Sequence, residues 1–224
     1  MSRMLKLRIS NDKSRLHFLA TVSAFLEQRI DLGFSLSLDL TQPAMSLARN
    51  FPIDLADQKK KAREKSCRIK ERKDLFRTLG YSIRDARMGK IRYTRRHDEL
   101  PEATAPFLIP LGGASTTADT DGLLAQARDL IRKSKRLKDG KALTNPTIDE
   151  LTKRLADAES SCWAVNNAEE SYKKAQKKAA LRRDQVDGTI RQLNYELTYH
   201  LKSETPENRI AAMKLYGFKW IKVE

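Results

Sequence analysis

Residues 147–202, TIDELTKRLADAESSCWAVNNAEESYKKAQKKAALRRDQVDGTIRQLNYELTYHLK, carry the clearest pattern in the sequence. Its apolar residues recur at alternating steps of three and four, which places them along one side of an α-helix. Thr147 and Glu150 have the spacing of a capping box at the start of this helix. An unbroken helix of this length would be about 84 Å long, so we expect an elongated molecule.

A second long helix is predicted over residues 53–94, because apolar residues recur there in steps of seven. The apolar seam is thin between Ala56 and Asp74, so this part packs weakly or projects from the bundle. A Pro/Gly-rich connector (95–120) and a third helix (121–138) come before the helix of 147–202. The expected fold is mainly α: an elongated antiparallel helical bundle over residues 51–224.

The first 50 residues predict a small β-α-β-like segment. Leu5, Leu7 and Ile9 alternate with polar residues, an amphipathic helix is expected over 14–31, and a second alternation follows. The apolar residues of that second alternation are Phe34, Leu36, Leu38 and Leu40. A two-stranded sheet is marginal alone, so it rests on the bundle or is completed by another chain. Phe34, Leu36 and Leu38 are therefore candidate partner contacts.

The chain ends in a short helix and an aromatic tail, residues 205–224. Thr205 is placed to cap the helix, and Gly217 is placed to stop it. Phe218 and Trp220 then either dock on the bundle end or bind a partner. Trp163 lies one position from the seam of the 147–202 helix, where a third helix covers it or a partner does.

The long helix, connector and longer helix ending in Tyr216-Gly217-Phe218-Lys219 resemble a set of uncharacterised bacterial helical-bundle proteins. The resemblance covers residues 54–222. It implies a helical bundle and carries no activity, cofactor or substrate.

Positive charge is concentrated in one segment. The chain has 44 Lys and Arg against 29 Asp and Glu, a formal net charge of +15. Residues 59–96 hold 16 of these cations and four acids, a local net of +12 that leaves +3 for the rest. We expect an anionic partner to bind there. The candidate residues are Lys59, Lys60, Lys61, Arg63, Lys65, Arg68, Lys70, Arg72 and Lys73.

No motif predicts an enzyme, a metal site or a cofactor. The histidines are far apart, and Leu111–Thr117 lacks the Gly-Lys-Ser/Thr ending of a phosphate loop. Two cysteines, Cys67 and Cys162, suggest a reducing compartment. No apolar stretch is long enough for a membrane span and none resembles a signal peptide, so a cytoplasmic protein is expected.

The leading functional hypothesis is a non-enzymatic structural or interaction protein within a larger assembly, bound to a protein partner or to itself. The alternative is a nucleic-acid-binding protein that uses the basic helix. A membrane surface is disfavoured as a partner, although basic helices do attract anionic lipids. No small-molecule substrate is expected.

Overall fold

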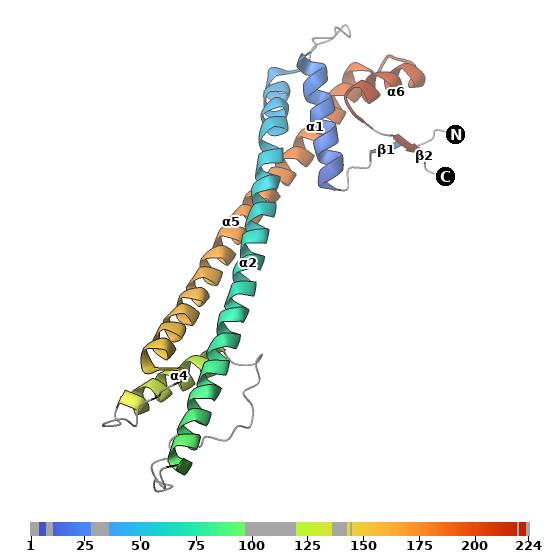
Figure 1. The fold of residues 1–224 in the computed structure, drawn as a ribbon. Helices are drawn as coiled ribbons and strands as arrows, with labels where there is room; N and C mark the ends of the chain where they lie inside the picture. Colours follow the sequence, from blue (N-terminus) through green and yellow to red (C-terminus); the bar gives the residue numbers. More distant parts are fainter. Residues whose placement is uncertain are drawn as a thin grey trace. The chain divides into compact units, whose positions relative to one another are not determined.

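The computed structural model describes residues 5–7, 11–27, 36–96, 120–135, 143, 145–218 and 220–222, with Leu38, residues 93–96 and both strands given by their backbone. These residues are mainly helical, which confirms the mainly-α prediction (Figure 1). The elements in chain order are β1 (Leu5–Leu7), α1 (Asp12–Glu27), α2 (Leu38–Arg96), α4 (Thr120–Lys135), α5 (Ile148–His200), α6 (Pro206–Leu215) and β2 (Trp220–Lys222).

The chain folds into two compact units. Unit 1 combines the described residues up to Lys61 with those from Tyr172 onward, and unit 2 comprises those from Ala62 to Ser171. Helices α2 and α5 each contribute a part to both units. The domain boundary predicted between residues 50 and 51 falls inside α2.

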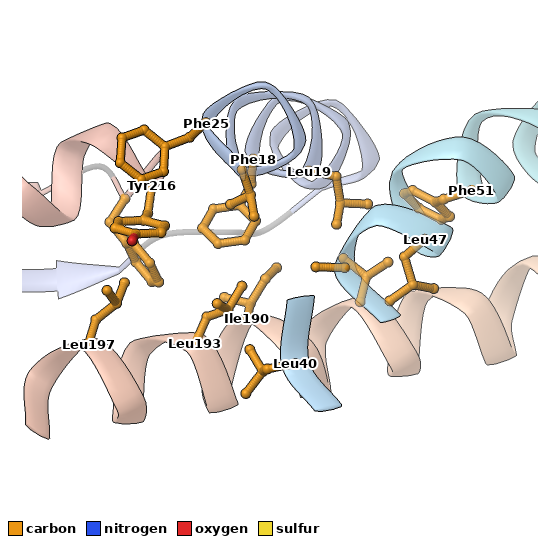
Figure 2. Close-up of a cluster of buried hydrophobic side chains, with 14 of the residues drawn as sticks. Phe18, Leu19, Phe25, Leu40, Leu47, Phe51, Ile190, Leu193, Leu197 and Tyr216 are labelled. Atoms are coloured by element: carbon orange, nitrogen blue, oxygen red, sulfur yellow. The ribbon is translucent and has the colours of Figure 1, made fainter. Parts of the chain in front are cut away.

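The core of unit 1 lies between α1, α2, α5 and α6. Phe18 and Leu19 of α1 point toward Ile190 and Leu193 of α5 (Figure 2). Tyr216 packs against Phe25, with ring centroids 4.5 Å apart. Each helix therefore buries one apolar face, and the burial of these large side chains is the main stabilising contribution in unit 1.

The predicted β-α-β segment is not formed. Strand β1 pairs antiparallel with β2 from the end of the chain, in the register Leu5↔Lys222, Lys6↔Ile221 and Leu7↔Trp220. Leu36 precedes α2 without regular structure, and Leu38 and Leu40 belong to α2. Phe34 lies outside the described residues.

Helix α2 begins at Leu38, where the first helical turn closes on Ser37, and its next residues have a helical seam. The Ser37 carbonyl accepts hydrogen bonds from the Leu40 and Thr41 amides, each at 3.1 Å. The buried face continues through Leu40, Ala44, Leu47, Phe51 and Leu55. Pro43 and Pro52 lie inside the helix, and each removes one backbone hydrogen bond. The packed apolar face offsets this cost.

Helix α6 ends at a glycine turn that returns the chain to α1. Thr205 caps the helix by accepting a hydrogen bond from the Asn208 amide, and Pro206 is its first residue. Gly217 has φ +81°, a left-handed conformation that glycine adopts without strain. The turn places Phe218 against Phe18, with ring centroids 5.0 Å apart.

In unit 2, a second core joins α2, α4 and α5. Its members include Phe76 and Leu79 of α2, Leu124 and Leu130 of α4, and Leu151 of α5. The capping box expected at the start of α5 is formed in both directions. The Thr147 amide donates to Glu150 Oε2 at 3.0 Å, and the Glu150 amide donates to Thr147 Oγ1 at 3.2 Å.

Candidate anionic-partner interface on helix α2

The nine cations predicted to bind an anionic partner all lie on α2, but they are divided between the two units. Lys59, Lys60 and Lys61 belong to unit 1, whereas the six from Arg63 to Lys73 belong to unit 2. The structure therefore defines two groups of cations, and the larger group can be described as one surface.

Two cations of the unit 2 group are engaged. Lys65 Nζ lies 3.6 Å from Glu169 Oε1 of α5. Arg68 NH1 lies 2.8 Å from Glu71 Oε2 on α2 itself, and both residues line a polar groove shared with Asp157 of α5. This flank of α2 faces α5.

The opposite flank carries a cationic stripe, which we define as Arg63, Lys70, Lys73 and Arg77. Steps of seven, three and four place these four residues within an arc of about 80° on an α-helix, roughly half a turn from Arg68. All four are exposed. Arg77 NH2 lies 2.9 Å from Asp74 Oδ1. Arg63, Lys70 and Lys73 make no ion pair with a described residue.

The prediction ended the basic set at Lys73 and missed Arg77. The step of four from Lys73 to Arg77 was the available signal. Arg72, which was predicted, is half-buried and lies off the stripe.

The acidic residues of α5 do not neutralise the stripe. The unit 2 part of α5 has six acidic residues. Three of them contact groups that do not belong to the stripe. Glu159 pairs with Arg128 of α4 at 2.6 Å, Glu150 caps its own helix, and Glu169 contacts Lys65. The stripe thus keeps an excess of positive charge at the surface.

The smaller group of cations lies at the end of the unit 1 part of α2. Lys59 and Lys60 are exposed, and Lys61 is half-buried. A hydrogen bond from Arg183 lowers the pKa of Asp12, and the charge of Lys59 adds a smaller effect in the same direction. Lys59 therefore belongs to the internal charge network of unit 1 as well as to its surface.

The predicted partner contacts differ in how far they are buried. Trp163 is 72% exposed, so the helices of unit 2 do not cover it. Phe218 is only 2% exposed, so its assignment as a partner contact is wrong: it is a core residue packed on Phe18. Leu36 is half-buried against the core of unit 1. Phe34 and the side chains of Leu38 and Trp220 lie outside the described part of the chain.

Sequence reasoning missed a set of charged residues that hold α1, α2 and α5 together in unit 1. Arg15 donates two hydrogen bonds to the Asp187 carboxylate, at 2.8 and 2.7 Å. Arg183 reaches Asp12 at 2.8 Å and Gln58 at 3.1 Å. These contacts join positions more than a hundred residues apart in the chain, and they support the fold.

Within the described ranges, no group of three or more His, Cys, Asp and Glu side chains is placed to hold a metal ion. No described helix combines the length and the apolar character that a membrane span requires.

Comparison with known proteins adds no relative. No family model, no curated protein and no solved structure matches the chain.

Proposed function

We propose that the protein is a non-enzymatic interaction protein that works within a larger assembly and binds an acidic protein surface through the cationic stripe of α2. The observation that supports this is the exposure of Arg63, Lys70 and Lys73 without an ion pair to any described residue. Like charges on one helix flank repel one another, and an anionic surface against the stripe would relieve that repulsion.

The test compares binding of a poly-glutamate probe to the wild-type chain and to a variant with Arg63, Lys70 and Lys73 changed to Glu. The matched control changes the exposed Lys135, Lys153 and Lys174 to Glu, which alters the net charge equally. We expect the stripe variant to lose binding and the control to retain most of it. Equal weakening of both variants would show that overall charge, not the stripe, is responsible.

The alternative is that the stripe binds nucleic acid, since phosphates satisfy the same cations. A duplex DNA probe separates the two functions through its salt dependence. Four phosphate contacts predict a slope of about −3.6 in log affinity against log salt, at roughly −0.9 per contact. Micromolar binding with that slope, lost in the stripe variant, would favour the nucleic-acid function. Absence of DNA binding at about 50 mM salt would eliminate it.

A further inference from the structure

The outer face of α5 in unit 1 carries large apolar side chains in water. Leu181 is 66% exposed, Tyr195 79% and Tyr199 71%. Figure 2 shows Ile190 and Leu193 pointing from the same helix into the core. Steps of 14 and 4 place the three exposed residues on the side of α5 opposite that core.

Charged residues and one glycine complete this outer face. Lys177, Asp184 and Arg191 are exposed and lie on the same side of α5. Among the described residues, Asp184 makes no ion pair, and Arg191 donates only to the Asp187 carbonyl of its own helix, at 3.2 Å. Gly188 lies in the middle, and a Cβ there would meet nothing within 4 Å.

We propose that this face is a self-association surface, on which α5 of a second copy of this chain packs antiparallel about a two-fold axis at Gly188. In such an isologous interface, two residues whose numbers are equally far from the axis face each other. Leu181 then faces Tyr195 of the second copy, seven residues to either side of Gly188.

The charged residues of this face find partners at or within one residue of this register. Asp184 lies four residues before Gly188 and Arg191 three residues after it, so the Asp184 and Arg191 of facing copies are offset by about 1.5 Å along the helix axis, which the long arginine side chain spans. Both residues lie on the same flank of this outer face, as a contact across a two-fold axis requires. Lys177 faces Tyr199, a cation beside an aromatic ring. Gly188 faces itself, and its lack of a side chain allows the helices to approach closely. Except for Gly188 on the axis, each pair occurs twice in the dimer.

A shallow groove beside the tyrosines fits the same arrangement. It is lined by Leu40 of α2 and by Arg191, Gln192, Tyr195, Glu196 and Tyr199 of α5. Leu181 of the second copy is placed beside it, where an apolar side chain would cover the exposed part of Tyr195. This surface is separate from the cationic stripe, so the inference does not depend on the proposed function.

The test measures the mass of the full chain by sedimentation equilibrium over a concentration series up to about 100 µM. We expect a reversible dimer. Asp184→Arg places two arginines opposite each other and should raise the dissociation constant roughly tenfold or more. The double variant Asp184→Arg/Arg191→Asp exchanges the charges and should restore the dimer. A monomeric wild-type chain, or an Asp184→Arg variant that dimerises unchanged, would overturn the proposal.

Cross-linking tests the register independently of variant stability. In a chain with Cys67→Ser and Cys162→Ala, Gly188→Cys should form a disulfide-linked dimer under mild oxidation, because the two-fold axis brings the thiols together. The matched control is Gln176→Cys, which is exposed on α5 but lies off this outer face. Equal cross-linking at both positions would also overturn the antiparallel register.

Discussion

Asp54 of α2 and Arg182 of α5 form an ion pair at the edge of the core of unit 1, with 2.9 Å between Asp54 Oδ2 and Arg182 Nε. Asp54 is only 4% exposed, and Lys178 Nζ reaches its other oxygen at 2.8 Å. Burial raises the pKa of Asp54, but the hydrogen bonds from Lys178 and Arg182 outweigh that effect and leave the pKa below its ordinary value. The carboxylate is therefore charged in the folded protein at neutral pH.

Removing this carboxylate should destabilise unit 1. Asp54→Ala leaves two cations without their shared partner, but both can turn toward water because Lys178 is 62% exposed and Arg182 28%. We therefore expect a loss of about 1–3 kcal/mol in unfolding free energy, less than for a pair with both partners buried. Denaturant unfolding measures it. The control is the exposed Asp57→Ala, and an equal loss there would refute the role of the ion pair.

The carboxylates of Asp12 and Asp54 predict how the unfolding free energy depends on pH. The folded-state pKa values of Asp12 and Asp54 lie below their ordinary values, Asp12 mainly through its hydrogen bond from Arg183. A carboxylate with a lowered folded-state pKa contributes its full stability when the pH is above its unfolded-state pKa of about 3.9. That stability is lost as the pH falls through the folded-state pKa. Unfolding free energy should therefore fall below about pH 4. The double variant Asp12→Asn/Asp54→Asn should fall less steeply, and an unchanged slope would contradict the prediction.

A Gly→Ala substitution should have opposite effects on stability at two positions, Gly217 in the turn after α6 and Gly80 inside α2. Gly217 has φ +81°, and a Cβ there would lie 3.1 Å from Thr21 Cβ, so Gly217→Ala should cost about 1–3 kcal/mol. Gly80 lies inside α2, where a Cβ would meet only Leu123 Cδ2 at 3.9 Å. Gly80→Ala should therefore stabilise by about 0.5–1 kcal/mol. Thermal unfolding of both variants measures the difference, and the same sign for both would refute it.

The sequence predicted α5 well because its seam and its capping box are local signals. It failed at the start of α2 because Leu36, Leu38 and Leu40 fit an alternating strand pattern. The stronger signal was the buried series Leu40, Ala44, Leu47, Phe51 and Leu55, which has helical spacing and continues across both prolines of α2.

The charged contacts of unit 1 could not be predicted in the same way. Asp54 and Arg182 are 128 residues apart in the chain. The local sequence around each residue is that of a solvent-exposed helix face, so it gives no sign that the two pair. Whether they meet depends on how α2 and α5 are rotated about their own axes. That rotation follows from the packing of the two apolar seams against each other and cannot be read from either seam alone. Three of the four residues of the cationic stripe (Arg63, Lys70 and Lys73) were predicted, in contrast, because they lie close together in the sequence of one helix.

The last prediction concerns Leu193, which is fully buried where α5 meets α1 (Figure 2). Leu193→Asp places an unpaired carboxylate in that core, at a cost of several kcal/mol. We expect unit 1 to unfold, with a fall in helical circular dichroism and rapid proteolysis in α1 and α6, whereas α4 of unit 2 stays protected. The control is Leu215→Asp, since Leu215 is 45% exposed on α6. A Leu193→Asp chain that is as helical and as protease-resistant as the wild type would show that this core does not hold unit 1 together.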